Sequence, residues 1–283
     1  MTTNNAIAMQ NIDGLIIDMD GVLWHGSSPL PGLQTFFALL RERKLPFVLA
    51  TNNASLTQQQ YIDKLSAMGV EVSAEEVLTS SMATATYLRE NLPKNKRRVF
   101  VIGEAGLTQP LQQQGFILTD LYEVDQPAKQ IHGVGADIVV SGLDRALSWD
   151  KLATATLNIR AGALFYATNS DTTLPTELGE VIGNGGTLAA LEAATGVKPI
   201  SIGKPEPILY QQALKILGTN ETNTVAIGDR LNTDILGAVN AGMRSIMVLT
   251  GVSSEQDIET VDYKPTWVLD DLEQVTQALG TNI

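Results

Sequence analysis

The amino-acid sequence predicts an α/β protein with a Rossmann-like parallel sheet. Short apolar runs alternate with longer stretches of helical periodicity, which is typical of βαβ units. The runs also carry three or four consecutive apolar residues, as expected for strands that are buried on both faces. The first set of predicted strands is GLIIDMD, PFVLATN, NTVAIGD, SIMVLTG and TWVLDD.

Helical patterns lie between these strands, at residues 33–44, 58–69, 208–218 and 233–242. Gly69 and Gly218 follow the last periodic residue of two of them, where a glycine commonly ends a helix. Pro205 lies near the start of a third, where proline is tolerated. These boundary signals support the alternation of strand and helix.

A second set of strands and helices occupies the middle of the chain. RRVFVIG, ADIVVSG and GALFYATN are its predicted strands, with helices around residues 105–114, 148–161 and 185–195. The strand ends that carry polar, reactive residues flank this block instead of lying within it. We therefore expect a core domain of residues 1–81 and 201–283, interrupted by a large inserted α/β domain of residues 82–200.

Composition excludes several functions. The formal net charge of the 283 residues is -12, which disfavours binding to nucleic acid and to anionic membranes. The absence of cysteine excludes disulfides, thiol nucleophiles and thiolate zinc sites, and two histidines leave little scope for a histidine triad. The first residues, MTTNNAIAMQN, lack the features of a signal peptide, and no apolar run could span a bilayer. We expect a soluble, cytoplasmic protein.

Two aspartates directly follow the first predicted strand. Ligands bind outside the carboxyl ends of strands in open parallel sheets, so Asp18 and Asp20 stand where chemistry is expected. Alternation along a strand would point both side chains to the same side. Gly21 permits a sharp turn immediately afterwards. Two adjacent carboxylates repel each other, so the pair needs a cation or a shared proton.

A second pair of aspartates follows the strand NTVAIGD. Asp229 and Asp234 could cap the helix that begins there. Together with Asp18 and Asp20, however, they would form a site of hard oxygen ligands, of the kind that magnesium binds along with water and substrate phosphate.

Donor groups for a phosphate occur at one other predicted strand end and before one predicted helix. Thr51 and Asn52 end the strand PFVLATN, where they could also form an ordinary turn. Lys204 precedes a helix start, a position that favours an anion, although a single lysine is more often solvated surface. Together, Thr51 and Lys204 would supply a hydrogen-bond donor and a positive charge to a phosphoryl group.

These segments resemble the haloacid dehalogenase (HAD) superfamily. DMDGV at 18–22, Thr51 with Asn52, Lys204 followed by proline, and GDRLNTD at 228–234 occur in the order of that family's motifs. WHGSSPLPG, TNN and ATNSDTTLP further resemble subfamily IIA, the NagD-like and p-nitrophenylphosphatase-like branch. The departures, at Trp149 and in the Gly-Asn-Gly segment that begins at residue 183, lie in the insertion.

The resemblance implies a Mg²⁺-dependent hydrolase of phosphate monoesters. It makes Asp18 the nucleophile that forms a phospho-aspartyl intermediate, and Asp20 the general acid and base. Magnesium would be held by the Asp18 carboxylate, the Asp20 carbonyl and Asp229, with Asp234 orienting the ligands around it. Thr51, Asn52 and Lys204 would bind phosphate oxygens.

The resemblance also implies that the insertion is a cap over the site. Asn169 and Asp171 are the cap residues expected to contact the substrate, a small phosphorylated metabolite. An Asx turn before Pro175 would explain these two residues equally well. A phosphotransferase or mutase, and a catalytically silent sensor of a phosphorylated metabolite, remain alternatives. The oligomeric state is open, with a homodimer through the cap as one arrangement.

Overall fold

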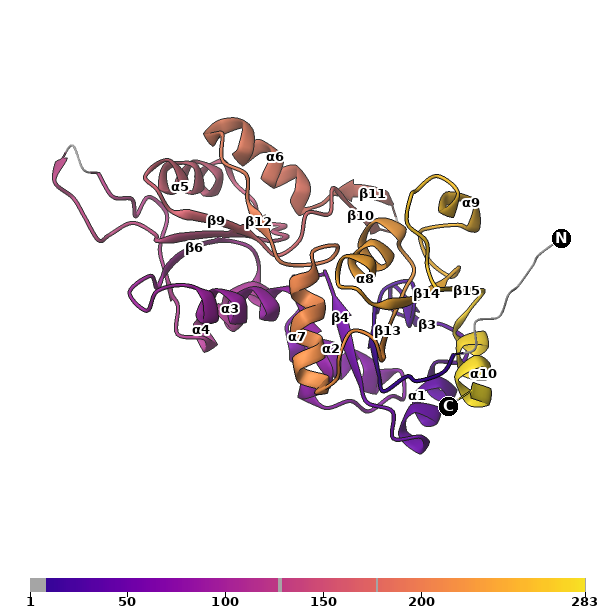
Figure 1. The fold of residues 1–283 in the computed structure, drawn as a ribbon. Helices are drawn as coiled ribbons and strands as arrows, with labels where there is room; N and C mark the ends of the chain where they lie inside the picture. The colour runs from indigo at the N-terminus through magenta and orange to yellow at the C-terminus, as the bar shows by residue number, and fades with distance from the viewer. Residues whose placement is uncertain (1–8, 127–128, 177, 283) are drawn as a thin grey trace. The chain divides into compact units, whose positions relative to one another are not determined.

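A computed structural model of the chain describes residues 9–126, 129–176 and 178–282. The first eight residues of MTTNNAIAMQN, the segment that lacks the features of a signal peptide, lie outside these ranges. The chain divides into two compact units (Figure 1). The first unit comprises Met1–Thr51, Ile62–Leu78 and Lys204–Ile283, and the second comprises Asn52–Tyr61 and Thr79–Gly203. Each contains a sheet of parallel strands with helices, which confirms the predicted fold class.

The first unit is built on a six-stranded sheet. In sheet order its strands are β15 (Trp267–Leu269), β14 (Arg244–Val248), β13 (Thr224–Gly228), β1 (Gly14–Ile17), β4 (Phe47–Thr51) and β5 (Val77–Thr79). The pairings from β15 through to β4 are all parallel. All four residues of β1 are buried. The continuous apolar run in the sequence predicted this burial, because it is typical of a strand that is covered on both faces.

Helices flank this sheet. They are α1 (Leu33–Glu42), α2 (Gln58–Ala67), which belongs to this unit from Ile62 onward, α7 (Pro207–Leu217), α8 (Leu236–Asn240), α9 (Glu255–Ile258) and α10 (Leu272–Asn282). Helix α7 packs against β1, β4 and α8, whereas α1 packs against α10. In Figure 1 the strands β4 and β13 run between α7 (orange) and α10 (yellow). A short antiparallel pair, β2 (Trp24–His25) and β3 (Ser28–Pro29), follows β1.

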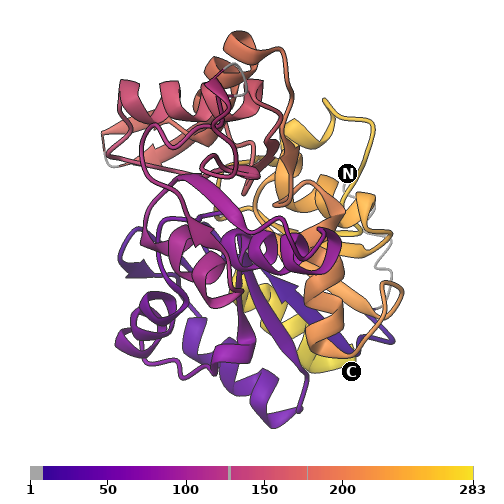
Figure 2. The same cartoon turned by 90° about the vertical axis from the view of Figure 1, so that its left-hand side faces the viewer.

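The second unit has a five-stranded sheet whose pairings are all parallel. In sheet order its strands are β12 (Ile200–Ser201), β9 (Leu164–Ala167), β8 (Ile138–Ser141), β6 (Arg98–Ile102) and β7 (Ile117–Leu118). Figures 1 and 2 show these strands between two pairs of helices. One pair is α3 (Ser80–Asn91) and α4 (Ala105–Gln113), and the other is α5 (Trp149–Arg160) and α6 (Asn184–Thr195).

Several elements were not predicted from the sequence. Strand β5, helices α3 and α10, and the antiparallel hairpin of β10 (Thr173–Thr176) and β11 (Gly179–Ile182) are the main ones. The helix predicted at residues 233–242 begins instead as a π-helical turn, η3 (Leu231–Ile235), before continuing as α8. The helix predicted to start near Pro205 starts at Pro207, so Lys204 lies in the preceding loop.

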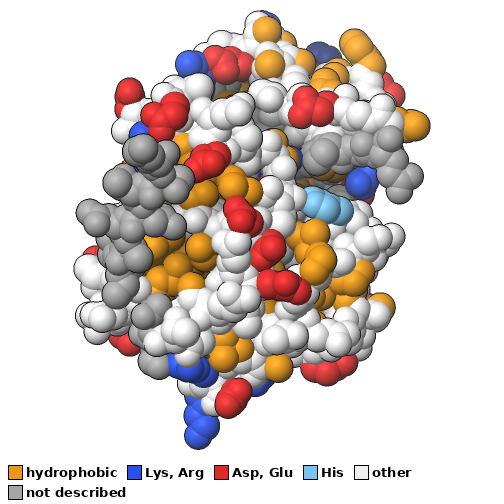
Figure 3. All heavy atoms as spheres, turned by 90° about the vertical axis from the view of Figure 1, so that its right-hand side faces the viewer, with side chains coloured by type: hydrophobic (Ala, Val, Ile, Leu, Met, Phe, Trp, Pro, Cys, Tyr) orange, Lys and Arg blue, Asp and Glu red, His pale blue; other side chains and the backbone are white. Residues whose placement is uncertain are grey.

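Surface features agree with the acidic composition. On the face shown in Figure 3, acidic side chains lie near the top and the bottom of the view as well as across its middle. Among the described residues, no helix is both long enough and apolar enough to cross a membrane.

Replacing Ile16 by alanine should destabilise the first unit. Ile16 is 2% exposed in the central strand β1, so the substitution removes buried methyl groups and leaves a cavity. We expect the free energy of unfolding to fall by about 2–5 kcal/mol, measured by urea denaturation. Ile216→Ala, at a position of the same unit that is 46% exposed, is the control and should change it by less than about 0.5 kcal/mol. Equal losses would contradict the assignment of β1 to the core.

Candidate active site

Three neighbouring strands of the first unit bring reactive residues to one edge of the sheet. Strand β1 lies between β13 and β4, and all three are parallel. Asp18 directly follows β1, Asp229 follows β13, and Thr51 is the last residue of β4. Since the carboxyl ends of parallel strands share one edge, residues more than 200 positions apart in sequence become neighbours.

Lys204 is the buried cation of this edge. Its side chain is 2% exposed, which rules out the interpretation of a solvated surface lysine. The ammonium group donates to Asp18 Oδ1 at 2.5 Å and to Asp234 Oδ1 at 2.6 Å. It also donates to the carbonyl oxygen of Ala50 in β4, at 3.0 Å. Lys204 therefore connects the ends of β1 and β4 to the turn that follows β13 by hydrogen bonds.

Asp229 is held by the loop that follows β14. Its Oδ2 accepts a hydrogen bond from the backbone N–H of Val252 at 2.7 Å. Its Oδ1 is buried and has no hydrogen-bond partner. The backbone packs so closely here that a Cβ added at Gly251 would lie 1.8 Å from Oδ2. Gly21, with φ of +87°, approaches the same oxygen, so glycines in two loops form part of the wall around this carboxylate.

The carboxylates of Asp18, Asp229 and Asp234 form one cluster. Each offers an oxygen within 4.8 Å of the others. Asp234 Oδ2 also accepts a hydrogen bond from the backbone N–H of Arg230 at 3.1 Å, at the start of the π-helical turn η3. Tyr210 fixes this turn by donating its hydroxyl hydrogen to the Asp234 carbonyl at 2.9 Å.

Burial and mutual repulsion shift the titration of this cluster. Burial raises the pKa of Asp18 well above its usual range; Lys204 opposes this shift, and the carboxylates of Asp234 and Asp229 add to it. Burial, with a further contribution from Asp234, raises the pKa of Asp229 to about 7. Burial works against the charged form of Lys204, but Asp18 and Asp234 hold its pKa well above the usual range. One lysine therefore does not fully compensate three buried carboxylates.

The cluster fits a small divalent cation. Its ligands would be carboxylate oxygens, which magnesium prefers, and the buried Oδ1 of Asp229 is an acceptor that a cation would satisfy. A second positive charge would also relieve the repulsion that raises the pKa of Asp229. Carboxylate oxygens of this kind could hold the magnesium ion expected from the sequence, and Asp234, which was expected only to orient the ligands, is one of the three carboxylates.

Asp20 lies apart from this cluster. Its side chain is exposed, and its Oδ1 accepts a hydrogen bond from the indole Nε1 of Trp24 at 2.7 Å. Strand β1 ends at Ile17, so the strand alternation that was expected to point Asp18 and Asp20 to the same side does not extend over them. The expected grouping of four carboxylates therefore reduces to three, since the Asp20 carboxylate is not among them.

The residues predicted around the phosphate and in the insertion fall into different units. Thr51 is buried at the end of the first-unit strand β4, and Asn52 begins a segment of the second unit. Within the second unit, the Asn52 side chain donates to both carboxylate oxygens of Asp171 at 3.3 Å, and its carbonyl accepts from Asn169 Nδ2 at 2.8 Å. Asn169 Oδ1 also accepts from the Asp171 N–H, so the alternative Asx turn is present.

Sequence reasoning missed three groups that shape the site. The N–H group of Val252 that donates to Asp229 belongs to the backbone, so no side-chain motif in the sequence reveals it. Tyr210 lies on the apolar face of α7, so the helical periodicity of the sequence indicated only that it packs in the core. Its hydrogen bond to the Asp234 carbonyl was not indicated. Trp24 lies within the WHGSSPLPG segment that supported the resemblance. Its position only four residues after Asp20 was the one sequence feature that could have indicated their hydrogen bond.

Comparison with known proteins identifies the family. A family model described as haloacid dehalogenase-like hydrolase matches residues 15–117, and a HAD-hydrolase-like model matches residues 201–275. The 5'-nucleotidase YutF of Bacillus subtilis (strain 168) is 37% identical over 264 residues, which cover 93% of this chain and 97% of that protein. The chain belongs to the haloacid dehalogenase-like hydrolases. The resemblance inferred from its motifs is thereby confirmed.

Two further relatives of this hydrolase support subfamily IIA. The acid sugar phosphatase of Staphylococcus saprophyticus is 36% identical over 96% of this chain and 99% of its own length. The structure of NagD from E. coli K-12 has a TM-score of 0.82 and 34% identity, covering 93% of this chain and 98% of that one. With relatives of these names, this hydrolase is a phosphatase that acts on phosphate esters.

Replacing Gly251 by alanine should impair this phosphatase without unfolding it. A Cβ would lie 1.8 Å from Asp229 Oδ2, so the carboxylate or the loop has to move. Because a misplacement of about 1 Å can cost about 100-fold in rate, we expect kcat/KM to fall by about that factor. The matched control is Gly280→Ala, where a Cβ meets nothing within 4 Å. Unchanged phosphatase activity in Gly251→Ala would show that Asp229 tolerates displacement.

Proposed function

We propose that this chain hydrolyses small phosphate monoesters with Mg²⁺, through a phospho-aspartyl intermediate on Asp18. The observation that carries the proposal is the cluster of Asp18, Asp229 and Asp234 around the buried ammonium group of Lys204. Asp229 and the Asp18 carboxylate, together with the Asp20 carbonyl, would hold the metal, while Asp234 orients Lys204 and the ligands of the metal. Bound magnesium would supply positive charge that stabilises the phosphoryl group during transfer.

Asp18 is the nucleophile in this proposal. One of its carboxylate oxygens attacks phosphorus, and the bond from phosphorus to the ester oxygen breaks. The Asp18 side chain is only 12% exposed, and Lys204 donates to its Oδ1, so the orientation of the carboxylate is restricted. Lys204 also reduces the repulsion between this anion and a dianionic substrate, which is the main electrostatic obstacle in a chain of charge -12.

Asp20 is the general acid and base. It gives its proton to the departing ester oxygen, which leaves as an alcohol. It then takes a proton from a water molecule, whose oxygen attacks phosphorus and releases Asp18 and inorganic phosphate. Its exposed side chain suits a group that exchanges protons with substrate and water. Thr51, Asn52 and Lys204 would bind the phosphate oxygens.

Substrate choice would rest on the inserted domain, residues 82–200, acting as a cap. Asn169 and Asp171 are the proposed substrate contacts, and their mutual hydrogen bonds with Asn52 give them fixed positions within the second unit. The relatives are named a 5'-nucleotidase and an acid sugar phosphatase. We infer a substrate of the same general kind, a small phosphorylated metabolite, hydrolysed in the cytoplasm by a monomer or a cap-mediated homodimer.

Asp18→Asn should abolish hydrolysis. An amide is a poor nucleophile, so kcat for phosphate release from 4-nitrophenyl phosphate should fall by about 10⁴-fold or more. Wild type quenched in acid during turnover should carry phosphate on the protein, and the variant should carry none. The control is Asp262→Asn, an exposed aspartate of the same unit, which should retain full activity. Equal activity of Asp18→Asn and wild type would reject Asp18 as the nucleophile.

Magnesium affinity should increase with pH up to about 7. Burial raises the pKa of Asp229 to about 7 in the metal-free protein, so below that pH the metal must displace a proton. We expect the dissociation constant from calorimetric titration to rise about fivefold from pH 7 to pH 6, and about tenfold per pH unit below pH 6, because the slope reaches its full value only well below the pKa of about 7. Asp229→Asn should bind weakly at every pH. An affinity that is constant from pH 6 to 8 would contradict Asp229 as a ligand.

A further inference from the structure

The side chain of Asp20 is exposed yet anchored. Its Oδ1 accepts a 2.7 Å hydrogen bond from Trp24 Nε1, and the indole that donates it is fully buried. Backbone contacts set this geometry, because the Gly21 N–H donates to the Trp24 carbonyl at 2.8 Å and an isolated β-bridge joins Asp20 to Trp24. The chain thus folds back after the aspartate motif and places a rigid donor beside the second aspartate.

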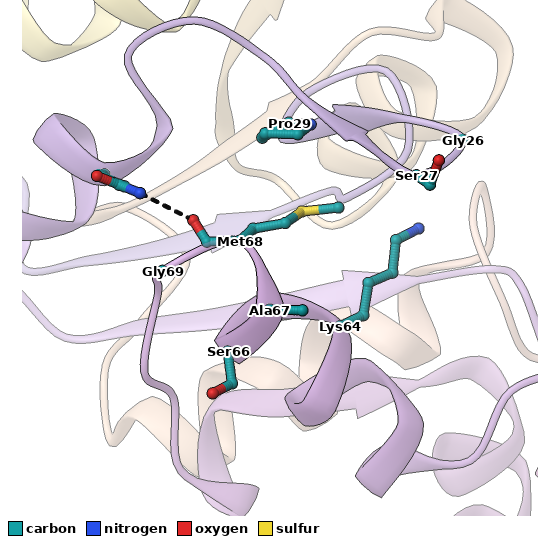
Figure 4. A pocket seen from close by; sticks show the side chains of 9 residues that line it. Gly26, Ser27, Pro29, Lys64, Ser66, Ala67, Met68 and Gly69 are labelled. Atoms are coloured by element: carbon teal, nitrogen blue, oxygen red, sulfur yellow. Dashed lines mark hydrogen bonds between the residues drawn. The ribbon is translucent and has the colours of Figure 1, made fainter.

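Lys64 covers one face of the indole ring. Its ammonium group lies 4.1 Å from the centroid of the Trp24 ring, a cation–π contact. Figure 4 shows Lys64 extending from α2 toward Gly26 and Ser27, along the wall of a surface cavity of about 710 Å³. Burial lowers the pKa of Lys64, and the Asp20 carboxylate acts in the opposite direction, so the two charges interact.

We propose that Trp24 is the positioning residue of Asp20, and that Lys64 keeps its indole in place. The inference rests on the proposed function, in which Asp20 protonates the leaving group. A carboxyl group has two oxygens, so the bond to Oδ1 restricts the rotamers of the group and leaves Oδ2 as the oxygen that carries the proton. General acid catalysis requires the acid within hydrogen-bond reach of the departing oxygen, and an exposed aspartate without an anchor would sample several rotamers.

A purely structural role for the hydrogen bond makes a different prediction. A buried indole N–H requires a partner, and Asp20 could serve only to satisfy it. Loss of the bond would then affect all substrates alike, through stability or general distortion. A positioning role instead affects only those substrates whose leaving group needs a proton. Alkyl phosphates need one because an alkoxide is a poor leaving group, whereas 4-nitrophenolate departs readily without one.

The test is Trp24→Phe, which keeps a buried aromatic ring and removes the N–H. With magnesium present, we expect kcat for an alkyl phosphate to fall about tenfold or more, since acid–base catalysis contributes about 10²- to 10⁴-fold. For 4-nitrophenyl phosphate kcat should fall less than about threefold, and KM should change less than about twofold for both. Trp267→Phe, at a buried tryptophan of strand β15, is the matched control and should show no difference between the two substrates.

Lys64→Met provides an independent variant if Trp24→Phe does not fold. Methionine keeps the apolar contact with the ring and removes the charge, at a half-buried position where unfolding is not expected. A smaller selective loss, about threefold on the alkyl phosphate and none on 4-nitrophenyl phosphate, is expected. Equal effects on both substrates in either folded variant, or no effect, would overturn the inference.

Asp20→Asn separates this inference from the proposed function. If Asp20→Asn hydrolyses the alkyl phosphate as fast as wild type, the acid–base role of Asp20 is wrong and the inference fails with it. If Asp20→Asn is inactive on the alkyl phosphate but Trp24→Phe shows no substrate-selective loss, the acid–base role stands and only the positioning role is overturned.

Discussion

The confinement of negative charge in a small buried volume is the constraint on which this site depends. Three carboxylates lie with oxygens within 4.8 Å of one another, and a single buried ammonium group, that of Lys204, bonds to two of them. At that separation, each pair of unit charges repels by about 3–4 kcal/mol at an effective dielectric constant of about 20. Protons or a divalent cation must offset the negative charge that Lys204 does not neutralise, as the raised pKa of Asp229 indicates.

The buried ion pairs organise the site more than they stabilise the fold. Desolvation of Lys204 and its two aspartates offsets much of their attraction, so a buried pair is weak support for stability. Its value lies in preorganisation, because phosphate monoester hydrolysis requires accelerations that can reach about 10²¹-fold and no single group supplies them. Gly21 and Gly251 contribute by letting backbone approach Asp229 more closely than any larger residue would allow.

Elements with a strong local pattern could be predicted from the sequence, and elements without one could not. Strands β1, β4 and β13 carry continuous apolar runs, and each was found. Helix α10 was missed although Leu272, Val275 and Leu279 repeat at helical spacing and all are buried. Helix α3 gave little apolar signal, because small polar residues such as Ser80 form much of its buried face. Tertiary hydrogen bonds satisfy them, as between the Ser80 hydroxyl and the Asn52 carbonyl.

The sequence by itself determined the family, the parallel sheet and the main reactive residues, because strand-end aspartates followed by glycine form a local pattern. Only the tertiary structure decided which of them meet. It placed Lys204 between Asp18 and Asp234, and it left the Asp20 carboxylate outside their cluster. It also joined Lys64 to Trp24, a contact between α2 and β2 that neither segment signals alone. Such contacts depend on how strands and helices distant in sequence pack, and local periodicity carries no information about that packing.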